Sequence, residues 1–216
     1  MNYDYTFFEQ HMRKLRTIEC FNDSTVTGEI YNLYGPEQAK DMVEMIVPTT
    51  LDIDKPAIFR CRGVYSLGGK PVDALEKAID AKFPDDFVQF YERFGSCVIV
   101  TASMSVRIFD VSEMIEQYRD DSEWELEDGD TGRFVRFAGF DGMIFDFGLR
   151  REHGSLTWDV AYTDHGLLFS EIITEQGREN TVAPSFYEWL RTVIETDVSG
   201  PFGADDVRII EDTLMP

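Results

Sequence analysis

Three short sequence blocks in a fixed order constrain what the last two-thirds of this chain can fold into. They are Phe83–Ser96 (FPDDFVQFYERFGS), Phe137–Phe147 (FAGFDGMIFDF) and Ala183–Leu190 (APSFYEWL). Each block combines an apolar pattern with a start, stop or turn signal, so each predicts an element and its ends. In order, they predict a helix, a strand hairpin and a closing helix.

The first block predicts an amphipathic helix. Its aromatic residues recur at i, i+3, i+4 and i+7, as a buried helical stripe requires: Phe87, Phe90, Tyr91 and Phe94. Pro84 suits the first turn, where a missing N–H costs nothing. Gly95 suits the left-handed residue just past the helix end.

The other two blocks carry equally local signals. The Asp141-Gly142 pair separates two strand-like runs, Phe134–Ala138 and Met143–Phe147, and this arrangement favours a hairpin. Ser185 and Glu188 have the spacing of a capping box. The residues after Ser185 supply the apolar stripe of the last helix: Phe186, Trp189, Leu190 and Val193.

Periodicity elsewhere completes a mixed set of elements. Strands are predicted in the ranges Ala57–Tyr65, Cys97–Ala102, Met104–Phe109, Leu156–Tyr162 and Gly166–Ile173. Short helices are predicted after Asp73 and over Val111–Tyr118. Helices followed by a meander of strands and a closing helix indicate the α+β class, with helices covering one sheet face.

The first 70 residues lie outside the three blocks. Tyr3–Arg16 has Phe8, Met12 and Leu15 at helical spacing, and Pro36–Ile46 shows a similar pattern. Ser66–Gly69 is the best turn or linker signal. We therefore expect an N-terminal extension over residues 1–70, a domain over 71–200 and a loosely held acidic tail over 201–216.

The order and spacing of the blocks resemble the SUKH superfamily, also called the Smi1/Knr4 family. The match rests on the Pro-led helix Pro84–Gly95, the hairpin and the closing helix. The hairpin positions are Phe137, Ala138, Asp141, Gly142 and Asp146, and the helix positions are Ala183, Ser185, Phe186, Trp189 and Leu190. The resemblance implies a mixed sheet of about six strands with helices packed on one face. It also implies a binding protein, because many bacterial members are immunity proteins that neutralise a cognate toxin.

Charge narrows the class of partner. The formal net charge is −21, and residues 70–216 hold 31 acidic and 13 basic side chains against ten and seven in residues 1–69. Such a surface disfavours nucleic acid and anionic membranes, which select basic side chains. It is compatible with a cationic protein partner. Solubility alone is the alternative explanation.

The acid is densest over residues 120–130. Seven of the eleven side chains are acidic, and Trp124 lies among them. One interpretation is a partner-binding edge, with the acids steering a cationic partner and Trp124 anchoring it: Asp120, Asp121, Glu123, Trp124, Glu125, Glu127, Asp128 and Asp130. The alternative is a solvated loop, with Trp124 folded back into the core.

No catalytic or metal-binding motif stands out. His11, His153 and His165 are far apart, the three cysteines form no CxxC, and GxSxG is absent. An EF-hand register within residues 123–130 places Asp128 where glycine is required. We therefore expect no enzyme activity, no metal and no cofactor. A pair of scattered carboxylates in a pocket would be the enzyme alternative.

The first hypothesis is therefore an immunity protein that binds a basic, nuclease-like toxin domain. The alternative is a regulatory protein–protein interaction module in signalling or assembly. We expect a cytoplasmic protein, because no apolar run approaches the ~20 residues of a membrane span and the N-terminus lacks a signal-peptide pattern. Three widely spaced cysteines are typical of reduced thiols in such a compartment.

Overall fold

The structure divides the chain into two compact units. It is a computed structural model that describes residues 2–20, 43–47, 57–69, 71–101, 105–122, 132–139, 145–152, 155–164, 181–196 and 207–215. Unit 1 comprises Met1–Asp4, Ser66–Cys97 and Arg107–Leu190. Unit 2 comprises Tyr5–Tyr65, Val98–Val106 and Arg191–Pro216.

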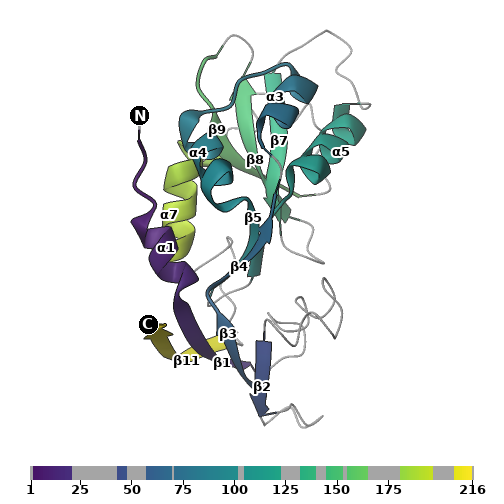
Figure 1. The fold of residues 1–216 in the computed structure, drawn as a ribbon. Helices are drawn as coiled ribbons and strands as arrows, with labels where there is room; N and C mark the ends of the chain where they lie inside the picture. The colour runs from purple at the N-terminus through teal and green to yellow at the C-terminus, as the bar shows by residue number, and fades with distance from the viewer. Residues whose placement is uncertain are drawn as a thin grey trace. The chain divides into compact units, whose positions relative to one another are not determined.

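Short helices are interspersed among runs of strands along the described chain (Figure 1). The helices are α1 (Thr6–Met12), α3 (Asp73–Ile79), α4 (Asp85–Phe94), α5 (Val111–Ser122) and α7 (Phe186–Thr196). The first strands are β1 (Lys14–Cys20), β2 (Val43–Val47), β3 (Ala57–Arg62), β4 (Val64–Gly68), β5 (Ser96–Val100) and β6 (Ser105–Ile108). The later strands are β7 (Gly132–Gly139), β8 (Phe145–Glu152), β9 (Asp159–Asp164), β10 (Thr181–Ala183) and β11 (Val207–Leu214).

The strands form two sheets. One has seven strands in the order β10-β9-β8-β7-β6-β5-β4, and the other has four in the order β11-β1-β3-β2. The described pairings are antiparallel, from β6 through β10 in the first sheet and throughout the second. The predicted α+β class is confirmed. The large sheet has seven strands where about six were expected.

Aromatic rings fill the core of unit 1. Helices α4 and α7 lie on one face of the β7–β8 strands (Figure 1), and their rings meet there. The Phe186 ring lies 5.2 Å from Phe87, 5.0 Å from Phe90 and 5.1 Å from Phe137, measured between centroids. Trp189 lies 4.8 Å from Phe137. The stripes predicted in the first and third blocks therefore pack against each other and the sheet.

Helix ends in unit 1 follow the local signals. The Ser185 hydroxyl accepts a hydrogen bond from the Glu188 amide at 3.2 Å, as the predicted cap requires. Gly95 ends α4 with φ +67°, and a Cβ there would lie 2.7 Å from the Gly68 carbonyl oxygen. Glycine is therefore required at this position by both conformation and space. The Asp86 carboxylate, 1% exposed, accepts the Tyr187 amide at 2.8 Å and so caps α7 from α4.

The interior of unit 2 contains charge. Arg16 on β1 is 0% exposed, and its Nε donates to the Asp212 carboxylate on β11 at 3.0 Å. Its NH1 group donates to the Val100 carbonyl oxygen at 2.6 Å. The buried His11 ring places Nε2 3.0 Å from that same oxygen. A backbone carbonyl of β5 is therefore shared by an arginine and a histidine.

Two predicted helices in the N-terminal region are wrong in part. Residues 14–16 belong to β1, and residues 43–46 belong to β2. In β1 the buried positions are Arg16 and Ile18, which alternate as in a strand. Because Arg16 is charged, a search for alternating hydrophobic residues does not detect this strand. In β2 Ile46 is 44% exposed, so its apolar character does not report burial. The helix predicted in Tyr3–Arg16 is confirmed over α1, Thr6–Met12, and only its extension to Arg16 is wrong. In the second segment, residues 36–42 lie outside the described residues, and residues 43–46 form a strand.

Candidate partner-binding surface

The predicted acidic segment begins at the end of helix α5. Asp120 is exposed in the last turn of this helix, and Asp121 follows it before the helix ends at Ser122. Six of the predicted partner-binding residues lie outside the described residues: Glu123, Trp124, Glu125, Glu127, Asp128 and Asp130. Their part in binding stays a prediction.

Two acidic residues at a helix C-terminus oppose the helix dipole. The C-terminal end carries partial negative charge, so cations stabilise it and carboxylates there are unfavourable by about 0.3–1 kcal/mol each at low salt. Arg119 is the basic residue in this turn. Helix stability therefore does not explain why acid occurs at this position.

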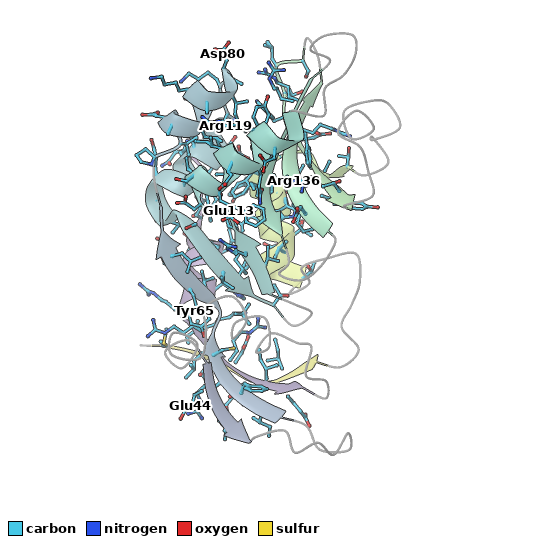
Figure 2. All side chains as sticks on the ribbon, turned by 90° about the vertical axis from the view of Figure 1, so that its right-hand side faces the viewer. Glu44, Tyr65, Asp80, Glu113, Arg119 and Arg136 are labelled. Carbon is cyan, nitrogen blue, oxygen red and sulfur yellow. The ribbon has the colours of Figure 1, made fainter. Side chains whose placement is uncertain are left out.

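Helix α3 ends in the same way. Its C-cap is Asp80, exposed and left-handed at φ 53°, ψ 47°, where glycine would be the unstrained choice. Figure 2 shows Asp80 and Arg119 toward one end of unit 1, with Glu113 further back along α5. The helices α3 and α5 pack together. Their acidic C-terminal ends therefore face solvent at one end of unit 1.

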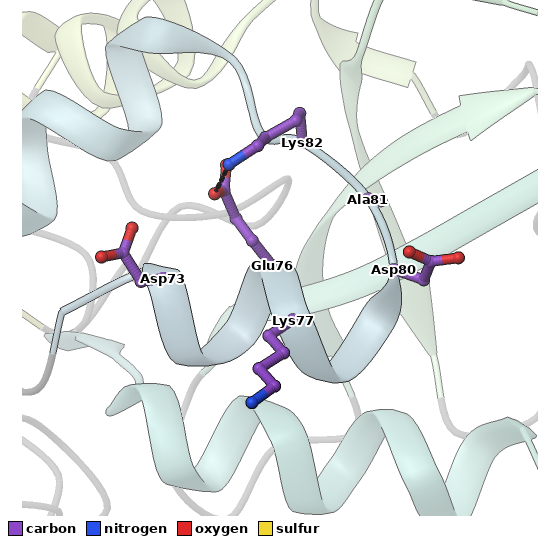
Figure 3. Close-up of a pocket in the computed structure, with 6 residues that line it drawn as sticks. All are labelled: Asp73, Glu76, Lys77, Asp80, Ala81 and Lys82. Atoms are coloured by element: carbon purple, nitrogen blue, oxygen red, sulfur yellow. Dashed lines mark hydrogen bonds and ion pairs between the residues drawn. The ribbon is translucent and has the colours of Figure 1, made fainter.

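An open hollow lies along α3 and the segment that follows it (Figure 3). Its lining residues are Asp73, Glu76, Lys77, Asp80, Ala81 and Lys82. Glu76 is already engaged, because it pairs with the Lys82 ammonium and accepts the Phe83 amide at 3.2 Å. The other acids that line the hollow are Asp73 and Asp80, beside Lys77.

A second group of charges crosses the large sheet on one face. Arg107, Gly139 and Asp146 are opposite one another on β6, β7 and β8, so they share a face. A Cβ on Gly139 would lie 2.2 Å from Asp146 Oδ1, so the carboxylate occupies the space that glycine leaves open. Asp146 binds Arg136 at 3.1 Å.

Each arginine of this face has a carboxylate partner. Arg107 binds Glu113 of α5 at 2.7 Å. Arg150, 2% exposed, binds Asp159 at 2.6 and 3.1 Å and also contacts the Thr181 hydroxyl. Buried charges persist only when they are paired and hydrogen-bonded, and these pairs meet that condition. They tie β6 to α5 and β7 through β10 to one another, and they are better explained as structure than as a ligand site.

Glu113 on α5, the carboxylate partner of Arg107, has a perturbed pKa. Burial raises the pKa of its carboxyl above the ordinary value of 4.5, and Arg107 opposes that rise. The neighbouring charges of Asp110 and Asp146 raise it further. Structural ion pairs also perturb pKa values, so this shift alone does not indicate catalysis.

The described histidine and cysteines are buried and unsuited to surface chemistry. His11 lies inside unit 2, and Cys61 and Cys97 are free thiols in the interior. Burial raises the pKa of Cys97, which keeps it protonated and unreactive. Within the described ranges, no group of three or more His, Cys, Asp or Glu residues could hold a metal ion.

Sequence reasoning missed two features of unit 1. The Asp86 carboxylate reads as a surface acid in a first helical turn, yet it is buried and caps another helix. Leu156 was assigned to a strand, yet it lies before β9 and is 94% exposed. Neither could be found from periodicity, because both depend on contacts between segments that are distant in sequence.

Comparison with known proteins identifies the family. No curated protein and no solved structure matches the chain significantly. No helix in the described part of the chain is both long and apolar enough to cross a membrane. The model of the SMI1/KNR4 family (SUKH-1) matches residues 70–192, more than half of the chain. The chain therefore belongs to the SMI1/KNR4 family, and this membership supports a protein-interaction or immunity-type role at the level of the family.

Proposed function

We propose that this protein is a non-enzymatic immunity protein that neutralises a cognate toxin domain by binding it directly. The observation that carries the proposal is that the segment matched by the family model also holds most of the chain's negative charge. The family model covers residues 70–192, and residues 70–216 hold 31 acidic and 13 basic side chains. A toxin that acts on nucleic acid has a basic surface, to which these carboxylates present the charge of phosphates.

The helix ends support a binding role for the acid. Asp80 and Asp120 occupy C-terminal ends of helices, where a carboxylate is locally unfavourable. Residues that break a local rule without a local benefit are expected at functional sites. An acidic surface accelerates encounter with a cationic partner, and buried aromatic or aliphatic anchors then hold it. Within residues 120–130, Trp124 is the proposed anchor.

The test begins with a search of the native genome for a toxin-domain gene beside this one, which the proposal predicts. The full chain and the toxin domain are co-expressed and growth is measured, and the dissociation constant of the purified pair is measured at 50 and 300 mM salt. We expect growth rescue and binding that weakens with salt, because exposed charges are screened. A wild-type chain that neither rescues growth nor binds the toxin domain would overturn the proposal.

Two variants that each remove four negative charges test which acidic residues accelerate binding to the toxin domain. The test variant D120N/D121N/E123Q/E125Q removes four charges from the predicted edge. The control E44Q/E92Q/E195Q/E211Q removes four from exposed positions elsewhere. We expect about a tenfold lower association rate for the test variant and a much smaller change for the control. Equal changes in both would reject residues 120–130 as the steering edge, and binding to a host regulatory protein instead would favour the interaction-module alternative.

A further inference from the structure

The N-terminal segment of unit 1 lies against helices α4 and α7 (Figure 1). The backbone amide of Tyr3 donates to the Gln89 side-chain oxygen on α4 at 3.2 Å. The Tyr187 hydroxyl on α7 donates to the Asp4 carbonyl oxygen at 2.9 Å. One hydrogen bond to each helix therefore holds the segment in place, and the Tyr3 ring contacts the Tyr187 ring.

Tyr3 and Tyr187 form a tilted pair of aromatic rings. Their centroids lie 5.3 Å apart, and the ring planes meet at 44°. Rings at this angle do not cover each other's faces, as rings in parallel stacking do. Both side chains are partly exposed. Because the face of an aromatic ring carries partial negative charge, a partly exposed pair of this kind attracts a cation.

Two carboxylates lie beside the ring pair. Asp85 and Asp86 are in the first turn of α4. Asp86 accepts the backbone amide of Tyr187 at 2.8 Å, so its carboxylate contacts one residue of the pair directly. Burial raises the pKa of the Tyr3 hydroxyl above its ordinary value of 10.0, and the negative charges of Asp86 and Asp85 raise it further. Both acids therefore act on the second residue of the pair.

The helix dipole explains acid in the first turn of α4, but it does not explain the two rings beside that acid. The basic residues one turn further along the two helices have other contacts. Arg93 on α4 lies 5.2 Å from the Phe94 ring centroid, and Arg191 on α7 binds Glu195 at 2.7 Å. The ring pair thus combines aromatic faces with negative charge, and these two features select a lysine or arginine side chain.

We infer that Tyr3 and Tyr187 form a docking site for a lysine or arginine side chain of the toxin domain, with Asp85 and Asp86 supplying negative charge beside the rings. The inference rests on the proposed function and adds a place of contact to it. Tyr187 lies within the residues matched by the family model, and Tyr3 lies outside them. The N-terminal segment therefore supplies one of the two rings, which residues 70–192 alone would lack.

Two substitutions separate the aromatic face of Tyr3 from its bulk. Tyr3→Phe keeps the ring and the backbone hydrogen bond to Gln89, so the dissociation constant should stay within about twofold of the wild type. Tyr3→Leu keeps the hydrogen bond but removes the ring, so we expect about a 3- to 30-fold weaker dissociation constant. Binding of the neighbouring toxin domain to the full chain is measured by surface plasmon resonance. Thermal melting of each variant checks that it folds.

A matched control removes a tyrosine ring from another part of unit 1. Tyr162 on β9 is also partly exposed. Because most residues outside a binding hot spot contribute little, Tyr162→Leu should change the dissociation constant by less than about threefold. An equal loss of affinity in Tyr162→Leu and Tyr3→Leu would contradict a specific site at the ring pair.

A second readout does not need the toxin domain. A tetra-arginine peptide is titrated into the full chain at low salt, and the tyrosine ring signals are followed by NMR. A cation over a ring shifts the signals of that ring, so we expect the signals of Tyr3 and Tyr187 to move together while those of Tyr162 stay in place. Asp85→Asn should weaken the peptide affinity read from these signals.

The two readouts distinguish this inference from the proposed function. If the wild type binds the toxin domain and Tyr3→Leu binds it equally well, the inference fails while the proposed function stands. If the wild type binds no toxin domain, the proposed function fails, and the peptide titration decides whether the rings bind a cation. A titration that leaves the signals of Tyr3 and Tyr187 unchanged overturns the site in either case.

Discussion

Two buried clusters, the aromatic rings of unit 1 and the group around Arg16 in unit 2, are built from different materials. In unit 1 the rings of Phe87, Phe137 and Phe186 meet between helices and sheet. In unit 2 the fully buried Arg16 is held by Asp212 and a backbone carbonyl. A ring cluster tolerates small changes in position, since dispersion and hydrophobic burial are not directional. A buried guanidinium is tolerated only with its partners in place.

This difference shows that the sequence signals for the ring cluster are local, whereas those for the Arg16 cluster are distant in sequence. The aromatic partners of unit 1 sit on elements whose ends are marked by nearby residues, such as the Ser185 cap. Arg16 and Asp212 are 196 residues apart in sequence. The ring cluster of unit 1 is therefore held by many contacts, whereas the cluster around Arg16 in unit 2 includes a pair that is remote in sequence.

The largest expected effect is on the ring cluster. Phe186→Ala removes a fully buried ring that touches Phe87, Phe90 and Phe137, so we expect a loss of about 3–5 kcal/mol in unfolding free energy. Urea denaturation measures it. The conservative control Phe186→Leu keeps most of the apolar volume and should cost less than half as much. A loss below about 1 kcal/mol for the alanine variant would show that the rings do not form the core.

A smaller effect tests the charge pair of unit 2. Asp212→Ala leaves Arg16 buried with its carbonyl partner alone. Because the Asp212 side chain is 32% exposed and water can replace part of its role, we expect about 1–3 kcal/mol. The neighbouring control Glu211→Ala should stay within about 0.5 kcal/mol. Combining Asp212→Ala with Arg16→Met should cost less than the sum of the two changes, and strict additivity would contradict the pairing.

The smallest effect is a pH dependence in unit 1. Burial raises the pKa of Glu113 above 4.5, so the folded state holds this proton more tightly than the unfolded state does. Its contribution to stability is present below the unfolded value and is lost as pH rises through the folded value. Relative to Glu113→Gln, the wild type should therefore lose stability between about pH 4 and the raised pKa, by less than about 1 kcal/mol because the pair is partly exposed.

Chemical denaturation of both proteins from pH 3.5 to 7 measures this difference. Glu92→Gln, at an exposed position of helix α4 in the same unit, serves as the control. A difference between wild type and E113Q that rises with pH would mean that Arg107 outweighs burial at this carboxyl. The Arg107–Glu113 ion pair would then stabilise unit 1, as the Arg16–Asp212 ion pair is expected to stabilise unit 2.

The sequence predicted unit 1 far better than unit 2. Phe87, Gly95 and Ser185 act within a few residues of their position, so a local pattern contains the information. Strand β1 was missed because its fully buried residue is Arg16, and charge at a core position reverses the usual signal. The C-terminal tail was expected to be loosely held, yet β11 pairs with β1 from Lys14 to Cys20.

The surface features of unit 1 were also predictable only in part from local sequence. Acid at residues 120–130 is visible in composition, and the structure describes its first residue, Asp120, as exposed at a helix end. The exposure of Leu156 could not be predicted, because it depends on Trp158 reaching Lys82, 76 residues away. The exposure of such a side chain is set by tertiary contacts and leaves no periodic pattern in the sequence.

The pairing of β1 with β11 has a consequence during synthesis. Lys14 through Cys20 emerge from the ribosome long before Leu214 through Val207 exist to pair with them. At a translation rate of about 5–20 residues per second, the 196 residues between Arg16 and Asp212 correspond to roughly 10–40 seconds. Throughout that interval β1 lacks the strand that completes its sheet, and its arginine lacks the carboxylate. The second unit is therefore the last part of the nascent chain to acquire its structure.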